Sequence, residues 1–144
     1  MPTKPELSLP VNPFQRLEVI VKQLRSAQGC PWDQQQTAAS LKKYLLEEAA
    51  ELAEAIDQGD AAFICEEAGD LYFVLALLLR ICEEQGGCSA EQALNGICEK
   101  MLRRHPHVFA PDGKPMPSDE QLRAQWEQIK AAEKAASGTC QVLC

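Results

Sequence analysis

The chain has 144 residues, of which 46% are hydrophobic, and its net charge is -7 at pH 7. This length suits one domain with a real core, and the acidic balance argues against a broad surface for nucleic acid or for anionic membranes. The longest apolar run, residues 71–79, is too short for a transmembrane span, which needs about 20 residues. We therefore expect a cytoplasmic protein that binds neither nucleic acid nor membrane.

The two ends of the chain differ from its middle. Prolines among polar residues near the N-terminus, without a basic region followed by an apolar stretch, predict a flexible leader over residues 1–12 and no signal peptide. A short flexible tail is expected over residues 136–144. The single helical domain is expected over residues 13–135.

Helical patterns begin early in the chain. No alternation of polar and apolar residues lasts longer than a few positions, which predicts an all-α fold. A proline in the first turn favours a helix over residues 13–28. After a turn at residues 30–33, Thr37 or Ser40 is expected to cap a second helix that runs to about residue 57.

Three further helices are predicted in the rest of the chain. The third, over residues 60–85, is apolar on all sides at residues 71–79, which indicates a central position or burial by a partner subunit. An oligomeric helical bundle is therefore expected. A fourth helix is predicted over residues 89–104, an irregular proline-rich loop over 105–117, and a last helix over 118–135.

Two acidic segments lie where these helices should bury an apolar stripe. On the second helix, Glu48 and Glu51 recur within the apolar stripe instead of opposite it. On the third helix, Glu67 and Asp70 occupy positions of an otherwise apolar seam. Residues three apart on a helix share a face, so the two pairs can converge on one point between the helices.

No neighbouring basic residue can neutralise these carboxylates. Between Lys43 and Arg80 the sequence has nine Asp or Glu residues and neither Lys nor Arg. Because an unpaired buried carboxylate costs on the order of several kcal/mol, a divalent cation is the economical partner. Oxygen ligands favour Mg²⁺, or Mn²⁺ in its place, over zinc, and a di-iron site is disfavoured because no His stands three residues after a Glu. A solvated acidic face is the structural alternative.

Basic residues that suit a phosphate lie further along the chain. A carboxylate-held Mg²⁺ commonly completes its coordination with substrate phosphates. Lys100 and Arg104 share a helix face with Arg103 beside it, and Lys130 stands four residues after Trp126. The structural alternatives are arginines at a helix C-terminus and a core tryptophan. Together with a metal site, this set predicts a triphosphate pocket.

Five segments of the chain are similar to one family. The segments are CPWDQQQT at 30–37, LLEEAAEL at 45–52, EEAGDL at 66–71, EKMLRRHPHVF at 99–109 and WEQIKAAEK at 126–134. In this order they closely resemble the MazG family of nucleoside triphosphate pyrophosphohydrolases. The resemblance implies an all-α bundle that forms a homodimer or homotetramer and hydrolyses a nucleoside triphosphate to the monophosphate and pyrophosphate.

The resemblance also implies roles for particular residues. The family's metal-binding pattern falls on Glu48, Glu51, Glu67 and Asp70. Its substrate contacts fall on Lys100, Arg104, Trp126 and Lys130, with Arg103 as a secondary candidate. Glu47 and Glu48 are the catalytic candidates, and Glu47 is expected to orient or deprotonate the attacking water.

Two departures from the family pattern concern the pocket. Relatives often have a His after the Thr of the CPWD segment, where this chain has Ala38 and Ala39. Some have a basic residue ahead of the second acidic motif, whereas residues 63–65 of this chain are uncharged. The pocket is therefore expected to be less cationic, which leaves base preference open. The alternatives are a pyrophosphatase for one modified or deoxy nucleotide, a phosphoribosyl-ATP pyrophosphatase, and a non-catalytic helical partner protein.

Overall fold

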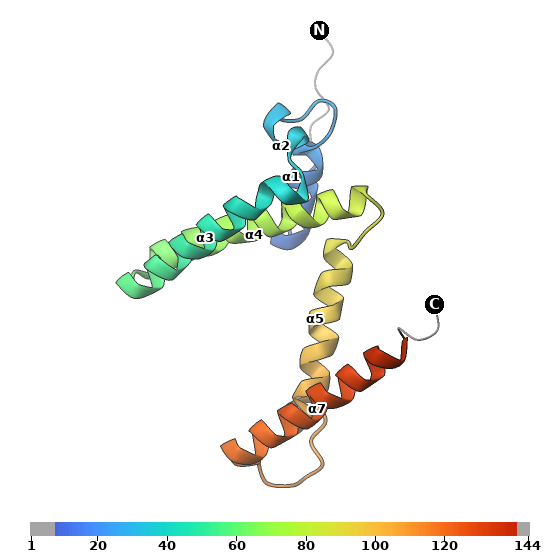
Figure 1. Ribbon diagram of the computed structural model, residues 1–144. Helices are drawn as coiled ribbons and strands as arrows, with labels where there is room; N and C mark the ends of the chain where they lie inside the picture. Colours follow the sequence, from blue (N-terminus) through green and yellow to red (C-terminus); the bar gives the residue numbers. More distant parts are fainter. Residues whose placement is uncertain (1–7, 141–144) are drawn as a thin grey trace. The chain divides into compact units, whose positions relative to one another are not determined.

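The computed structural model describes residues 8–140, in which all regular structure is α-helical and no strand occurs, as Figure 1 shows. This confirms the all-α prediction. None of the helices in this part of the chain is long and apolar enough to cross a membrane. The helices are α1 (Pro13–Leu24), α2 (Pro31–Gln35), α3 (Ala38–Gln58), α4 (Ala61–Glu84), α5 (Ala90–Arg104), α6 (Pro106–Phe109) and α7 (Asp119–Cys140).

The chain divides into two compact units, of which the first ends at Glu91 and the second begins at Gln92, within the first turn of α5. Of the predicted leader, residues 8–12 contain no helix or strand and the rest lies outside the described residues.

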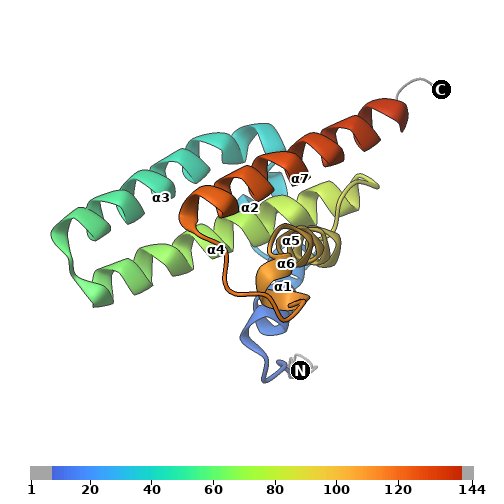
Figure 2. The same cartoon turned by 90° about the horizontal axis from the view of Figure 1, so that it is seen from below.

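In the first unit, α3 and α4 lie side by side as a hairpin (Figures 1 and 2). Gly59 ends α3 in the left-handed conformation, with a φ of 70°, which glycine adopts without steric cost. The Asp60 carboxylate then accepts hydrogen bonds from the amides of Ala62 and Phe63 and caps α4. Thr37 and Ser40 act together at the start of α3, where they form a reciprocal capping box.

The core of the first unit joins three helices. Val21 from α1, Leu41 from α3, and Leu77 and Ile81 from α4 are each no more than 2% exposed and contact one another. Burying a side chain of this size contributes about 1.5–3 kcal/mol, so this cluster anchors α1 to the α3–α4 hairpin. Ile56 on α3 is exposed and does not contribute to this core.

The helix α1 ends at Leu24, four residues before its predicted end. The chain turns back there, because the Cys30 amide donates to the Leu24 carbonyl at 2.8 Å. A Cβ atom at position 29 would lie only 2.1 Å from the same carbonyl oxygen, so the turn requires Gly29. The short helix α2 begins inside the predicted turn at residues 30–33 and continues beyond it to Gln35.

Arg25 connects this turn to α4. Its Nη1 donates to the carbonyls of Asp33 and Gln36 at 2.5 and 3.2 Å, and its Nη2 lies 2.7 Å from Oε2 of Glu84. Arg80 donates to the other oxygen of the same carboxylate at 2.9 Å. Glu84 therefore binds two arginines, one of which holds the segment around α2.

Two predictions for the second unit need correction. The region expected to be irregular contains the short helix α6, which Pro106 begins with its fixed φ. The last helix continues to Cys140 instead of ending near residue 135. The predicted flexible tail is thus helical at residues 136–140, and its last four residues lie outside the described part.

Candidate functional site

Carboxylates from both acidic segments meet on the α3–α4 hairpin. Glu48 from α3 and Glu67 and Asp70 from α4 each offer an oxygen atom, and these atoms lie within 4.8 Å of one another. We call these three residues the acidic cluster. Glu67 is only 5% exposed, Glu48 is half-buried and Asp70 is exposed. The spacing and the hard oxygen donors suit a divalent cation.

Glu51 and Glu47, the other two predicted acids, lie beside the acidic cluster on α3. Both are exposed. Burial raises the pKa of Glu67, and the charges of Glu51 and Asp70 and a hydrogen bond with Glu51 raise it further. Burial also raises the pKa of Glu48, with added repulsion from Glu51, Asp70 and Glu47. All five predicted acids therefore belong to one electrostatic group.

One oxygen of Glu67 gives the strongest local reason for a cation. Its Oε2 atom is buried and has no hydrogen-bond partner among residues 8–140. A buried carboxylate oxygen without a donor is costly, and a bound cation would satisfy it. The residues present therefore fit a hard divalent metal ion.

The expectation that all four predicted ligands occupy the buried seam was wrong for two of them. Glu51 and Asp70 are exposed at the edge of the helix pair, whereas Glu67 lies inside it. Two packed helices bury only a narrow stripe of each other, so residues three positions apart can fall on either side of its border.

The second unit contains the predicted phosphate and nucleoside contacts. The Arg104 guanidinium lies 5.1 Å from the ring centre of Trp126, and the His105 ring meets Trp126 edge-on at 5.4 Å. Lys100 is half-buried, and Lys130 is exposed and lies 3.3 Å from Glu127. The structure thus brings Arg104 and Trp126 together, at the end of α5 and on α7.

Arg103 and Arg104 share one acidic partner that the sequence analysis missed. Glu133 on α7 lies 2.9 Å from Arg103 and 2.7 Å from Arg104, measured between side-chain nitrogen and oxygen atoms. Its spacing was a usable signal, because it stands seven residues after Trp126 and three after Lys130, on the same helix face. Asp33 was also missed; it is 5% exposed, and its Oδ1 has no hydrogen-bond partner among residues 8–140.

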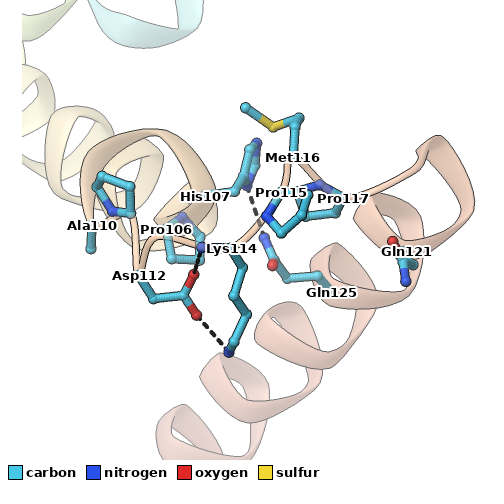
Figure 3. A pocket seen from close by; sticks show the side chains of 11 residues that line it. Pro106, His107, Ala110, Asp112, Lys114, Pro115, Met116, Pro117, Gln121 and Gln125 are labelled. Atoms are coloured by element: carbon cyan, nitrogen blue, oxygen red, sulfur yellow. Dashed lines mark hydrogen bonds and ion pairs between the residues drawn. The ribbon is translucent and has the colours of Figure 1, made fainter.

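A hollow of about 750 Å³ lies between the proline-rich loop and α7 in the second unit (Figure 3). The His107 ring nitrogen Nδ1 lies 3.0 Å from the Gln125 amide nitrogen, and Lys114 pairs with Asp112 at 2.6 Å across the loop. None of the predicted site residues lines this hollow. Its lining is Pro106, His107, Ala110, Pro111, Asp112, Lys114, Pro115, Met116, Pro117, Gln121 and Gln125.

Comparison with known proteins identifies the family. The profile of the MazG nucleotide pyrophosphohydrolase domain matches residues 36–109, which include the whole α3–α4 hairpin. The chain belongs to the MazG family. Its fold matches the crystal structure of a MazG-related protein from Thermotoga maritima with a TM-score of 0.65 and 30% identity, over 80% of this chain and 96% of that one. The expected family membership is therefore confirmed.

Longer proteins with related sequences match most of the chain. An uncharacterized protein of Bacillus subtilis, YabN, is 43% identical over 95% of this chain and 28% of its own length. A Thermotoga maritima protein named nucleoside triphosphate pyrophosphohydrolase/pyrophosphatase MazG is 42% identical over 84% of this chain, and an Escherichia coli nucleoside triphosphate pyrophosphohydrolase is 40% identical over 87%. The chain spans 45% and 47% of the lengths of the latter two.

Proposed function

We propose that this chain hydrolyses nucleoside triphosphates to the monophosphate and pyrophosphate in the presence of Mg²⁺, with Mn²⁺ as a substitute. The observation that carries the proposal is the acidic cluster with the unpartnered buried oxygen of Glu67. The names of the similar Thermotoga maritima and Escherichia coli proteins support the reaction class.

We assign the metal ligands to the α3–α4 hairpin. Glu48, Glu51, Glu67 and Asp70 would hold the ion, since their oxygens share one electrostatic group and hard oxygens are the ligands that Mg²⁺ prefers. When bound, such an ion activates water and neutralises the charge that develops on the pyrophosphate leaving group. Glu47, exposed next to Glu48, would orient the attacking water or accept its proton.

Residues of the second unit would bind the substrate. Lys100, Arg104 and Lys130, with Arg103 as a further candidate, would position the phosphates, and Trp126 would contact the nucleoside. Arginine suits this role because its planar N–H groups match phosphate oxygens in pairs. During the reaction, water adds across the α–β anhydride bond, so the α-phosphate leaves as monophosphate and the other two phosphates leave as pyrophosphate.

A substrate panel tests this proposal and its rivals. Pyrophosphate release is measured from the common triphosphates and several modified or deoxy ones, and from phosphoribosyl-ATP, with Mg²⁺ and with Mn²⁺. Turnover of only one modified nucleotide would favour a specific house-cleaning enzyme. No product from any triphosphate with either metal would contradict the proposal and favour a non-catalytic helical partner.

The variant Asp70→Asn tests the metal site. We expect it to lower kcat/KM at least about 100-fold, because a ligand of the charge-stabilising ion is lost at an exposed position that does not support the core. The matched control is Asp57→Asn, which removes an exposed carboxylate from the same helix hairpin outside the acidic cluster. Wild-type Mg²⁺-dependent activity in Asp70→Asn would show that this site assignment is wrong.

A further inference from the structure

Glu133 divides its two oxygens between two arginines. Its Oε1 accepts from Nε of Arg103 at 3.0 Å and lies 2.9 Å from Nη2 of the same residue. Its Oε2 accepts from Nε and Nη2 of Arg104 at 3.2 and 2.7 Å. The side chains of Glu133 and Arg104 are only 22% and 17% exposed, so this ion pair is partly buried, whereas the Arg103 side chain is 52% exposed.

The contacts with Glu133 use the same edge of both arginines. A guanidinium has five N–H groups in one plane, and in each case Nε and Nη2 face the carboxylate. Among residues 8–140, the contacts of Arg103 and Arg104 with carboxylates use Nε and Nη2, and Nη1 of neither arginine meets an acceptor. Each arginine therefore keeps its outer edge, formed by Nη1 and the second hydrogen of Nη2, for a further partner.

The orientation of Arg104 is fixed from a second side. Its guanidinium lies over the Trp126 ring at 5.1 Å from the ring centre, which restrains the group while Glu133 sets its rotation in the plane. Two positive charges face one negative charge in this group, so a net positive charge remains. Paired N–H groups on a charged edge are the arrangement that binds phosphate oxygens bidentately.

We infer that Glu133 is a positioning residue for the substrate: it holds Arg103 and Arg104 side by side so that their outer edges bind one phosphate group. The inference rests on the proposed function, because it assigns the arginines to a polyphosphate chain. The opposite role, in which Glu133 competes with phosphate for the arginines, predicts effects of the opposite sign.

The variant Glu133→Gln separates the two roles by the direction of the change. Removing a negative charge near a phosphate site would by charge alone strengthen phosphate binding. Positioning by Glu133 predicts the reverse: KM for the triphosphate rises about tenfold, while kcat changes less than about twofold because Glu133 does not touch the reacting bond. Calorimetry should show a similar weakening of binding of inorganic tripolyphosphate without divalent metal.

Asp112→Asn is the matched control, because it removes one carboxylate charge from the same unit without contacting either arginine. Its KM and tripolyphosphate affinity should stay within about twofold of the wild type, since surface charges are strongly screened. Glu133→Asp keeps the charge but shortens the side chain, so it should also raise KM, by less than the glutamine variant does. It serves in place of Glu133→Gln if that variant does not fold.

The binding measurement keeps this inference separate from the proposed activity. If the wild type binds tripolyphosphate but releases no pyrophosphate from any triphosphate, the proposed function fails, and weaker binding by the Glu133 variants still supports the inference. Unchanged or tighter binding of tripolyphosphate by folded Glu133→Gln or Glu133→Asp would overturn the inference. Lack of tripolyphosphate binding by the wild type would overturn it too.

Discussion

At Glu67, burial and neighbouring charge act in the same direction. Burial first, and then the charges of Glu51 and Asp70, raise the pKa of this carboxyl above its ordinary value of 4.5. The folded protein therefore holds the proton more tightly than the unfolded chain does. The resulting stability is present below pH 4.5 and is lost as the pH rises through the higher pKa of the folded state.

Because the charged form of Glu67 is unfavourable in the folded protein, replacing it with a neutral residue gives a testable prediction for Glu67→Gln. At pH 7 without divalent metal, the variant should melt at a higher temperature than the wild type, because it removes a buried charge but keeps the shape of the side chain. The difference should shrink as the pH falls toward 4.5, because the wild-type carboxyl of the folded protein takes up its proton above that value. Mg²⁺ should raise the Tm of the wild type more than that of the variant.

Thermal melts at several pH values, with and without MgCl₂, check this prediction. The control is Glu54→Gln, which removes an exposed charge from the neighbouring helix α3, outside the acidic cluster. Equal melting temperatures of the wild type and Glu67→Gln at neutral pH, with equal responses to Mg²⁺, would show that the buried charge of Glu67 does not destabilise the fold.

Glu84, which joins different helices, stabilises the fold with the opposite pH dependence to Glu67. Hydrogen bonds from Arg25 and then Arg80 lower the pKa of its carboxyl, against the effect of burial. The ionised form is thus favoured in the folded state, so the stability that Glu84 contributes is present above about pH 4.5 and is lost as the pH falls. The contact connects α4 to the end of α1 and, through Arg25, to the segment around α2.

Glu84→Gln should therefore destabilise the first unit by about 1 kcal/mol at pH 7, a modest value because solvent screens a carboxylate that remains 30% exposed. Urea unfolding at pH 7 and at pH 3 measures the effect. The difference from the wild type should decrease at the lower pH, since the wild-type carboxyl then gains a proton. A larger difference in unfolding free energy between the wild type and Glu84→Gln at pH 3 than at pH 7 would contradict this prediction.

For the whole molecule, the surface of the first unit suggests self-association. Tyr72 on α4 is 53% exposed, Phe14 on α1 is 51% exposed, and their rings meet edge-on at 5.7 Å. Leu75, one turn further along α4, is 38% exposed. We propose that this apolar face contacts a second copy of the chain in a homodimer or homotetramer, because single exposed apolar residues are common but adjacent large ones often mark an interface.

The mass in solution checks this proposal. The wild type should elute as a dimer or tetramer in light scattering, and Leu75→Glu should shift it toward the monomer by placing a charge in an apolar contact. Met116→Glu, at an exposed loop position of the second unit, should leave the mass unchanged. A monomeric wild type would show that the exposed face has another role.

Local rules in the sequence predicted most of the helices correctly. Thr37 with Ser40, Gly59 and Asp60 each act through hydrogen bonds or backbone conformation within a few residues, so the ends of α3 and the start of α4 could be derived without tertiary information. The pattern of acids on two helices likewise located the acidic cluster. The early end of α1 could not be predicted, because it depends on how the chain turns back toward Leu24 and Arg25.

By itself, then, the sequence determined the all-α class, the family and the pair of helices that carry the acids, because periodicity and capping are local properties. Only the tertiary structure decided that Glu67 is buried while Asp70, three residues on, is exposed. It also decided that Glu133, distant in sequence, pairs with Arg103 and Arg104. Burial and ion pairing depend on where helices cross in space, and spacing along one helix does not specify that.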